Sequence, residues 1–207
     1  MNTQTKIIAT GAESEIHQIT KTTLKKIRLE KTYRIPEIDT KLRKSRNRRE
    51  FKVLTKLYEN NILVPKPYKL IEDKRIDEIS FEFEYINGQV LKNCLTKNSL
   101  NQAFNEIIKI HKLEITHGDL TTLNMIKQKT TNKIYIIDFG LSEFTTKAED
   151  RAVDLNLFFN CIKNEHPNFY KHKEQLLKIY EKEIDKKTIK SLNNLELRGR
   201  NKKKLQK

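Results

Sequence analysis

The spacing of apolar residues changes character about two-fifths of the way along the chain. In the first part, one longer stretch with helical spacing covers 41–60, and short strand-like apolar runs cover 6–10, 15–20, 24–29, 69–71 and 80–85. The proline-containing segment 64–68 is predicted to close the helical stretch, because proline disfavours helical geometry in the residue before it. This part is therefore predicted to form a small antiparallel sheet with a single helix.

The second part is predicted to be mostly helical. Its apolar positions fall three or four residues apart, as at Leu100, Phe104, Ile107, Ile108 and His111. Two short apolar segments, 115–117 and 134–137, interrupt this pattern and lead into polar loops. We expect an α+β chain with a sheet-containing N-lobe at 1–86, a mostly helical C-lobe at 87–190 and a basic tail at 191–207, of which the last stretch, 198–207, is expected to be disordered.

The two polar loops carry the strongest chemical signal. One spells HGDLTTLN over 117–124, and the other, 14 residues after Asn124, spells DFG over 138–140. The spacing matches the catalytic-loop and metal-binding motifs of protein kinases. Phosphoryl transfer from ATP needs Mg²⁺ across the phosphates and a carboxylate that aligns the attacking oxygen. We therefore predict Asp119 as the catalytic base, and Asn124 and Asp138 as Mg²⁺ ligands.

Such a site also needs a lysine on the nucleotide phosphates and a carboxylate that holds this lysine. Strand alternation places Lys26 on the same side as Leu24 and Arg28, and we predict it as the phosphate lysine, with Lys25 as the rival. Glu50 lies on the apolar helix face and is predicted to pair with Lys26, because an unpaired carboxylate there would be destabilising. A surface salt bridge to Arg46 is the alternative.

The segment between the first two predicted strands stands where a kinase has its glycine-rich loop. We predict that it covers the phosphates of ATP through four residues: Gly11, Ala12, Glu13 and Ser14. Its single glycine fits an ordinary hairpin turn equally well.

Downstream of the second loop, the chain is too short for a peptide-docking platform. Asp154 follows Gly140 by only 14 residues. Gly118 stands where a kinase has the arginine that would bind a phosphate group on a phosphorylated activation segment. Water is then the natural acceptor, which favours ATP hydrolysis. Asp154 is predicted either to anchor the catalytic loop from behind or to cap a helix.

The chain is strongly basic, with 42 Lys and Arg against 27 Asp and Glu and a net charge of +15. The cations gather in two stretches, which predicts a surface for a nucleic-acid backbone; tRNA, and not DNA, is the partner implied by the family resemblance described below. The surface would be made of Lys41, Arg43, Lys44, Arg46, Arg48, Arg49, Arg198, Arg200, Lys202, Lys203 and Lys204. A merely solvated helix face is the alternative. No apolar run suits a membrane span, so we expect a cytoplasmic protein, also nuclear if the cell has a nucleus. Cys94 and Cys161 stand in no metal-ligand spacing.

Several motifs together resemble one family. They are GAES at 11–14, KTYRIPEID at 31–39, LRKSRNRRE at 42–50, HGDLTTLN at 117–124, IDFGLS at 137–142 and EDRAVDL at 149–155. The set resembles the small atypical serine/threonine kinase and ATPase subunit of the KEOPS complex. Ser14, where alanine is expected, and the absence of an acidic residue after Arg198 are the departures.

The resemblance implies a minimal two-lobed kinase-like fold and a role in forming threonylcarbamoyladenosine next to the tRNA anticodon. It also implies Mg-ATP as cofactor, ATP hydrolysis with serine/threonine autophosphorylation, and binding to the threonylcarbamoyl-transferase and other KEOPS subunits. By resemblance, Lys26 and Glu50 are the nucleotide lysine and its partner, Asp119 the base, and Asn124 and Asp138 the metal ligands. Two alternatives stay open: a small-molecule kinase of the aminoglycoside or choline type, and a catalytically idle ATP-binding scaffold.

Overall fold

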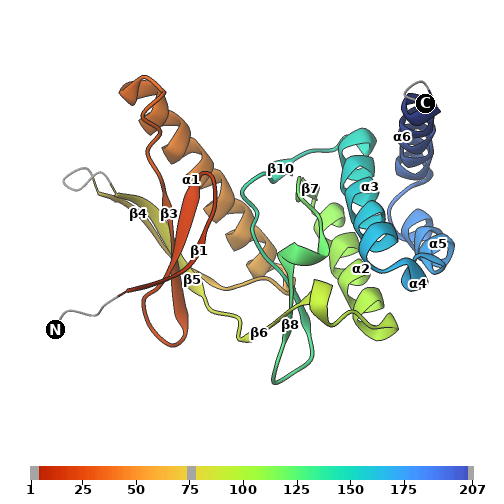
Figure 1. Cartoon of the computed structure of the whole chain (residues 1–207), viewed down its shortest axis with the longest axis horizontal. Helices are drawn as coiled ribbons and strands as arrows, with labels where there is room; N and C mark the ends of the chain where they lie inside the picture. Colours follow the sequence, from red (N-terminus) through yellow and green to blue (C-terminus); the bar gives the residue numbers. More distant parts are fainter. Residues whose placement is uncertain (1–4, 74–77, 205–207) are drawn as a thin grey trace. The chain divides into compact units, whose positions relative to one another are not determined.

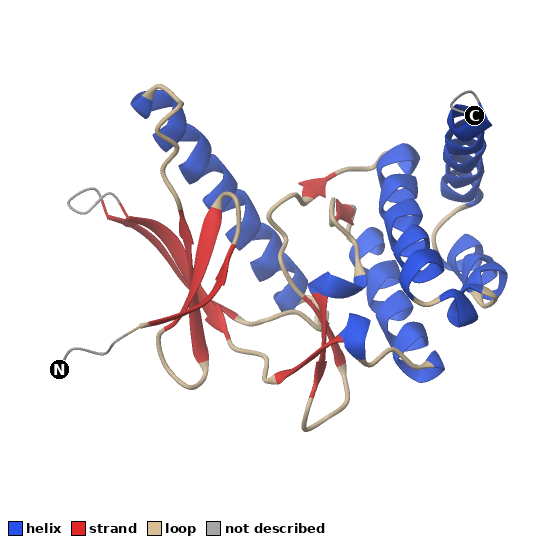
Figure 2. Cartoon of the chain, viewed as in Figure 1, coloured by secondary structure: helices blue, strands red, loops and turns tan. Residues whose placement is uncertain are grey.

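The computed structural model describes residues 5–73 and 78–204, with side chains up to residue 198. The chain forms two compact units, Met1–Asn87 and Gly88–Lys207, which are called here the N-terminal and the C-terminal unit. Strands and one long helix make up the first unit, and helices dominate the second (Figure 2). None of the helices in the described residues is both long and apolar enough to cross a membrane.

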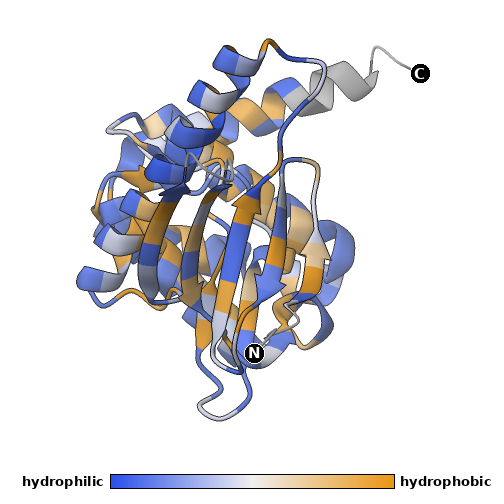
Figure 3. Ribbon diagram, turned by 90° about the vertical axis from the view of Figure 1, so that its left-hand side faces the viewer, coloured by the Kyte–Doolittle hydropathy of each residue, from blue (hydrophilic) through white to orange (hydrophobic). Residues whose placement is uncertain are grey.

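The N-terminal unit is built on a five-stranded antiparallel sheet (Figure 1). Its strand order is β1-β2-β3-β5-β4, with β1 (Lys6–Thr10), β2 (Ser14–Gln18), β3 (Thr23–Arg28), β4 (Pro67–Asp73) and β5 (Glu78–Glu84). Hydrophobic and hydrophilic residues mix along each strand, as expected where one face of a sheet is covered (Figure 3). The position of β3 inside the sheet places its buried side chains in the middle of the unit.

Helix α1 (Pro36–Glu59) packs on β4 and β5. Val53, Leu54 and Leu57 of α1 are buried with Phe81 of β5, and together they form the apolar core of the unit. The helix begins five residues before the expected start, because Pro36 suits the first helical position and acidic residues in the first turn favour a helix N-terminus.

The C-terminal unit combines helices with two small sheets. Strands β6 (Gly88–Val90), β8 (Met125–Gln128) and β9 (Ile134–Ile136) form one sheet, and β7 (Ile115–Thr116) pairs with β10 (Glu143–Phe144) in the other. The helices are η1 (Leu91–Asn93), α2 (Lys97–Lys112), η2 (Thr122–Asn124), α3 (Ala148–Glu165), α4 (Pro167–Tyr170), α5 (Lys173–Glu183) and α6 (Lys186–Lys204).

The core of the C-terminal unit lies among α2, α3 and α5. Phe104 of α2 contacts the rings of Phe158 and Phe159 on α3 and of Tyr180 on α5. The periodic residues of α2 are all buried, as their spacing predicts. Thr96 and Ser99 form a reciprocal capping box at the start of α2. This rigid group of helices supports the loops that follow β7 and β9.

The predicted disordered tail is wrong for the residues that the structure describes. Helix α6 continues through Lys204, and it packs against α3. Leu192 is fully buried and anchors the helix, while the lysines that follow are good helix formers. The basic residues at the end of α6 are therefore helical because the beginning of the helix has a core contact.

Candidate active site

Strand β3 places Lys26 in the middle of the N-terminal sheet. Lys26 pairs with Ile16 of β2 and with Phe81 of β5. Burial alternates along the strand, so that Lys26 and Arg28 are both buried on the side of α1, as strand alternation predicts. Lys25 points the other way and donates to Glu78 at 3.0 Å.

Glu50 of α1 meets this strand with its carboxylate. Its Oε1 accepts a hydrogen bond from Lys26 Nζ at 2.7 Å, and its Oε2 accepts one from Arg28. All three side chains are nearly inaccessible to solvent, and Glu50 is 3% exposed. The predicted ion pair is thus present, whereas the alternative partner Arg46 binds Glu13 instead. The second cation, Arg28, was missed, although strand alternation placed it on the same side as Lys26.

The loop between β1 and β2 is a tight hairpin turn. The Gly11 N–H donates to the Ser14 carbonyl at 2.9 Å, and the Glu13 carbonyl accepts from the Leu29 N–H at 3.1 Å. The Gly11 N–H is therefore already used inside the turn. The phosphate-covering role of Gly11, Ala12, Glu13 and Ser14 stays a prediction.

In the C-terminal unit, the pairing of β8 with β9 brings the predicted metal ligands to one end of a sheet. Met125 at the start of β8 pairs with Ile136 at the end of β9. One step further, the Ile137 N–H donates to the Asn124 carbonyl at 2.9 Å. Asp138 follows directly, so the two predicted Mg²⁺ ligands leave the same end of adjacent strands.

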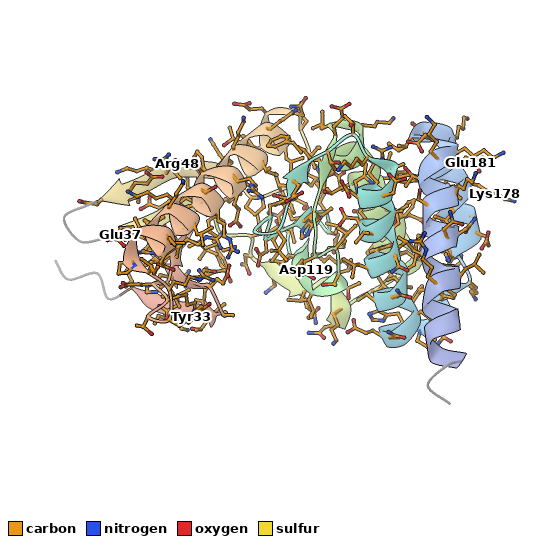
Figure 4. All side chains as sticks on the ribbon, turned by 90° about the horizontal axis from the view of Figure 1, so that it is seen from above. Tyr33, Glu37, Arg48, Asp119, Lys178 and Glu181 are labelled. Atoms are coloured by element: carbon orange, nitrogen blue, oxygen red, sulfur yellow. The ribbon has the colours of Figure 1, made fainter. Side chains whose placement is uncertain are left out.

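Asn124 also fixes the predicted base, Asp119 (labelled in Figure 4). Its Nδ2 donates to Asp119 Oδ2 at 2.9 Å and to the Asp119 carbonyl at 2.8 Å. With its amide nitrogen turned to Asp119, Asn124 leaves its oxygen as the metal-binding atom. The catalytic-loop part of the predicted constellation is therefore brought together within the C-terminal unit.

His117 joins the two loops through its ring. Its Nδ1 accepts from the Asp119 N–H at 3.2 Å, and its Nε2 lies 3.0 Å from the Ile137 carbonyl. Because Nδ1 accepts a hydrogen bond and Nε2 faces a carbonyl oxygen, the ring proton is assigned to Nε2. The ring also packs on Phe139, with ring centroids 4.8 Å apart.

Asp154 holds the catalytic loop from behind. Its Oδ2 accepts from the His117 N–H at 2.6 Å, and its Oδ1 accepts from the Gly118 N–H at 2.8 Å. Burial would raise the pKa of Asp154, but hydrogen bonds from His111 and the His117 N–H lower the pKa below its usual value. The anchoring prediction is confirmed, and the helix-cap alternative is wrong because α3 begins six residues earlier, at Ala148.

A third donor to Asp154 comes from α2. His111 Nε2 lies 3.2 Å from Asp154 Oδ2, and His111 Nδ1 lies 2.7 Å from the Tyr180 hydroxyl. Burial raises the pKa of Tyr180, so its hydroxyl stays protonated in this contact. His111 was predicted only as a residue of the buried face of α2; nothing in its spacing indicates this polar role.

Backbone geometry explains why glycine follows His117. Gly118 has a φ of +81°, and a Cβ built on it would lie 2.3 Å from the Leu141 carbonyl oxygen. A side chain at this position is therefore excluded by the segment that follows DFG. Asp138 also has a positive φ, +62°, a strained conformation of a kind found at functional sites.

The donor set suits Mg²⁺. Mg²⁺ uses one or two protein oxygens and keeps several waters, so a carboxylate from Asp138 and an amide oxygen from Asn124 suffice. Within the described residues, no group of three or more His, Cys, Asp or Glu side chains is placed to hold a metal ion.

The cations of α1 divide into two groups. Lys41, Lys44 and Arg48 line an open hollow on one helix face together with Glu37, Thr40 and Ser45; Glu37 and Arg48 are labelled in Figure 4. Arg43 does not belong to this face, because it is 5% exposed and its Nε donates to Asp39 at 2.7 Å. Its predicted RNA contact stays a prediction, and the burial of Arg43 speaks against it.

The remaining predicted RNA contacts divide in the same way. Arg46 binds Glu13, whereas Arg49 is exposed. Arg198 near the end of α6 is exposed, while the side chains of Arg200, Lys202, Lys203 and Lys204 lie outside the described residues.

These features define a kinase-like α+β fold with the catalytic-loop and DFG elements of a phosphotransferase. The model of the RIO domain family matches residues 6–173. The chain belongs to the RIO-domain family of atypical kinases and, within it, to the Bud32 family of KEOPS complex subunits.

The relatives span the archaea and eukaryotes. The KEOPS complex subunit Bud32 of Pyrococcus abyssi is 34% identical, with 94% of this chain and 96% of the relative covered. The EKC/KEOPS complex subunit bud32 of Dictyostelium discoideum is also 34% identical, with 95% and 83% covered. A probable bifunctional tRNA threonylcarbamoyladenosine biosynthesis protein of Methanobrevibacter smithii is 35% identical, and this chain spans 36% of its length.

Among solved structures, the Rio2 kinase complex with ADP/Mg²⁺ and phosphoaspartate from Chaetomium thermophilum has the same fold. Its TM-score is 0.63 at 16% identity, with 90% of this chain and 68% of that chain covered.

Proposed function

We propose that this chain binds Mg-ATP and transfers the γ-phosphoryl group to water and to serine or threonine hydroxyls on itself. In this proposal it acts as a KEOPS subunit that supports threonylcarbamoyladenosine formation in tRNA. The observation that carries the proposal is the hydrogen bond between Asn124 and Asp119, 2.9 Å long, on a loop whose backbone Asp154 holds. The names of the Bud32 relatives supply the biological setting, with the transferase subunit and the other KEOPS subunits as partners.

Each residue of the site has a defined task in this proposal. Asp119 orients the attacking oxygen and takes its proton, and Asn124 keeps the carboxylate in position. Lys26, held by Glu50, binds the nucleotide phosphates. Mg²⁺ held by Asp138 and Asn124 would neutralise charge on the phosphates.

The segment after DFG supports water as acceptor. Glu143 and Phe144 of β10 pair with Thr116 and Ile115 of β7, and the Thr145 N–H donates to the Glu114 carbonyl at 2.7 Å. The segment is thus bound to the body of its unit along its length until α3 begins. A protein substrate needs an open platform there, whereas water does not.

The fate of labelled γ-phosphate tests this proposal. Wild type, Asp119→Asn and Asp138→Ala are compared with Mg-ATP, with and without the transferase subunit and tRNA. We expect free phosphate as the main product, with turnover lower by about 100-fold or more in both variants. Label that accumulates mainly on other proteins or on a small molecule would overturn the hydrolysis proposal. Equal turnover by all three proteins would overturn the assignment of Asp119 and Asp138 to the site.

We also propose that tRNA contacts the exposed face of α1 through Lys41, Lys44 and Arg48. These cations share one helix face, and a phosphate backbone could follow the hollow that they line. Substituting Lys41→Glu together with Lys44→Glu should weaken tRNA binding about tenfold and flatten its dependence on salt. Lys178→Glu, on the exposed surface of α5, is the matched control; an equal loss there would contradict a local site.

A further inference from the structure

A second cationic pocket lies inside the N-terminal unit, apart from the exposed face of α1. Its free volume is about 10 Å³, room for about one water molecule, so a larger anion fits only when a lining side chain moves aside. The β1–β2 turn, the end of β3, the following loop and α1 all contribute to it, and its charged lining residues are Glu13, Arg28, Lys31, Arg34, Arg43 and Arg46. Five cations therefore face a single acidic side chain.

The neighbouring carboxylates neutralise only part of this charge. Asp39 accepts from Arg43 at 2.7 Å and from Arg34 at 3.3 Å, and Glu50 is shared between Arg28 and Lys26. These three acids, Glu13, Asp39 and Glu50, are each shared between two cations, and Lys31 adds a positive charge of its own. A pocket lined so largely by cations favours the binding of an anion.

One donor in the pocket is buried and unsatisfied. Arg28 is 6% exposed and uses its Nη2 on Glu50, but its Nε has no hydrogen-bond partner among the described residues. A buried guanidinium N–H without an acceptor is destabilising, so the pocket has unused binding capacity for an oxygen ligand. Lys31, half-buried at the same pocket, forms no ion pair within the described part of the chain.

Glu13 now occupies the position that an incoming anion would take. Its carboxylate accepts from Arg46 and lies 3.6 Å from Arg34 Nη2. The hydrogen bond from Arg46 lowers the pKa of Glu13, so it carries its charge at neutral pH. A carboxylate brings one negative charge, whereas a phosphate monoester brings close to two and three acceptor oxygens.

We propose that this pocket binds a phosphate dianion, either free phosphate or a phosphate monoester, which displaces the Glu13 carboxylate from Arg34 and Arg46. Arginine forks match the geometry of phosphate oxygens, and the Arg28 Nε gains the acceptor that it lacks. The site is a property of the N-terminal unit alone and does not depend on nucleotide turnover.

Titration of the full-length protein with inorganic phosphate, followed by ³¹P NMR at constant ionic strength and without nucleotide or Mg²⁺, tests the proposal. Arg34→Gln and Arg46→Gln should each weaken phosphate binding about tenfold, whereas Glu13→Gln should strengthen it by a similar factor. Lys69→Gln is the control, because Lys69 is an exposed cation of the same unit that lines neither this pocket nor the exposed face of α1. A control that loses as much affinity as Arg46→Gln, or a Glu13→Gln variant without tighter binding, would overturn the site.

A second arm identifies the source of the phosphate. If O-phosphoserine binds more tightly than free phosphate, with the same dependence on Arg34 and Arg46, the pocket is assigned to a phosphorylated side chain. The reverse order of affinities assigns it to free phosphate.

If Mg-ATP displaces phosphate stoichiometrically, the pocket is part of the nucleotide site and the proposal fails. It fails equally if only an RNA oligonucleotide responds to these variants. Asp138→Ala should bind phosphate normally, so loss of turnover and loss of this site remain distinguishable.

Discussion

Asp154 and Glu50 are both buried carboxylates that accept several hydrogen bonds, but they stabilise different kinds of structure. Asp154 binds two backbone N–H groups and one histidine, so it fixes the path of the catalytic loop. Glu50 binds two cationic side chains, so it fixes where charges lie on a strand whose backbone the sheet already holds. The partners of a buried carboxylate therefore decide whether its loss disturbs the fold of a loop or the charge balance of a site.

The largest effect is expected at Glu50. Glu50→Gln removes the counter-charge that Lys26 and Arg28 share in a buried position, which should lower the free energy of unfolding by about 3–5 kcal/mol. Glu72→Gln is the matched control, because Glu72 pairs with the exposed Arg48 and should change stability by less than about 1 kcal/mol. Urea unfolding followed by circular dichroism measures the free energy of unfolding of both variants. Similar losses of stability in the two would mean that the buried ion pair contributes no more than the exposed one.

Asp154→Asn should have a somewhat smaller effect on stability but a large effect on turnover. The asparagine amide keeps one acceptor oxygen but turns its NH₂ donor toward a backbone N–H that then lacks an acceptor. This should lower the free energy of unfolding by about 2–3 kcal/mol. Because the loop carries Asp119, ATP turnover should fall in parallel while nucleotide affinity, which depends on Lys26, changes little. If Asp154→Asn instead weakens nucleotide binding and keeps the turnover rate, Asp154 does not act through the catalytic loop.

Gly118→Ala should perturb the same loop from its other side. The added Cβ meets the Leu141 carbonyl at a positive φ, which should destabilise the protein by about 1–3 kcal/mol. At Gly11 a Cβ would meet only the Ser14 carbonyl, at an ordinary 3.6 Å, so Gly11→Ala should be nearly neutral for stability. Thermal unfolding of the two alanine variants separates them, and equal melting temperatures would contradict the steric explanation.

The smallest effect is the pH dependence that Asp154 contributes. Its pKa is lowered in the folded protein, so its stabilising contribution is present above the ordinary pKa of aspartate, about 3.9, and is lost as the pH falls through the folded value. Unfolding free energies between about pH 6 and pH 2 should therefore fall less steeply for Asp154→Asn than for wild type. Parallel curves would mean that Asp154 titrates equally in the folded and unfolded protein.

Residues fixed by local periodicity could be predicted from the sequence. Strand alternation put Lys26 inside, helical spacing put Glu50 on the buried face, and their ion pair followed because neither charge is stable there alone. The spacing of the kinase motifs likewise located Asp119 and Asn124.

Contacts that depend on tertiary position could not be predicted in this way. The bond from Arg28 to Glu50, the bond from Arg46 to Glu13 and the burial of Arg43 join distant segments or need the orientation of α1 on the sheet. The helical course of α6 also depended on a core contact at Leu192, which composition does not reveal.

Threonylcarbamoyladenosine formation by a reconstituted KEOPS complex tests the central claim most directly. The complex would contain either the wild-type chain or Asp119→Asn, with complex assembly and nucleotide binding verified for each. The account predicts that tRNA modification is lost with Asp119→Asn although the complex assembles and binds ATP. Full modification by that variant would contradict it, because the chain would then act as an ATP-binding scaffold and not as an enzyme.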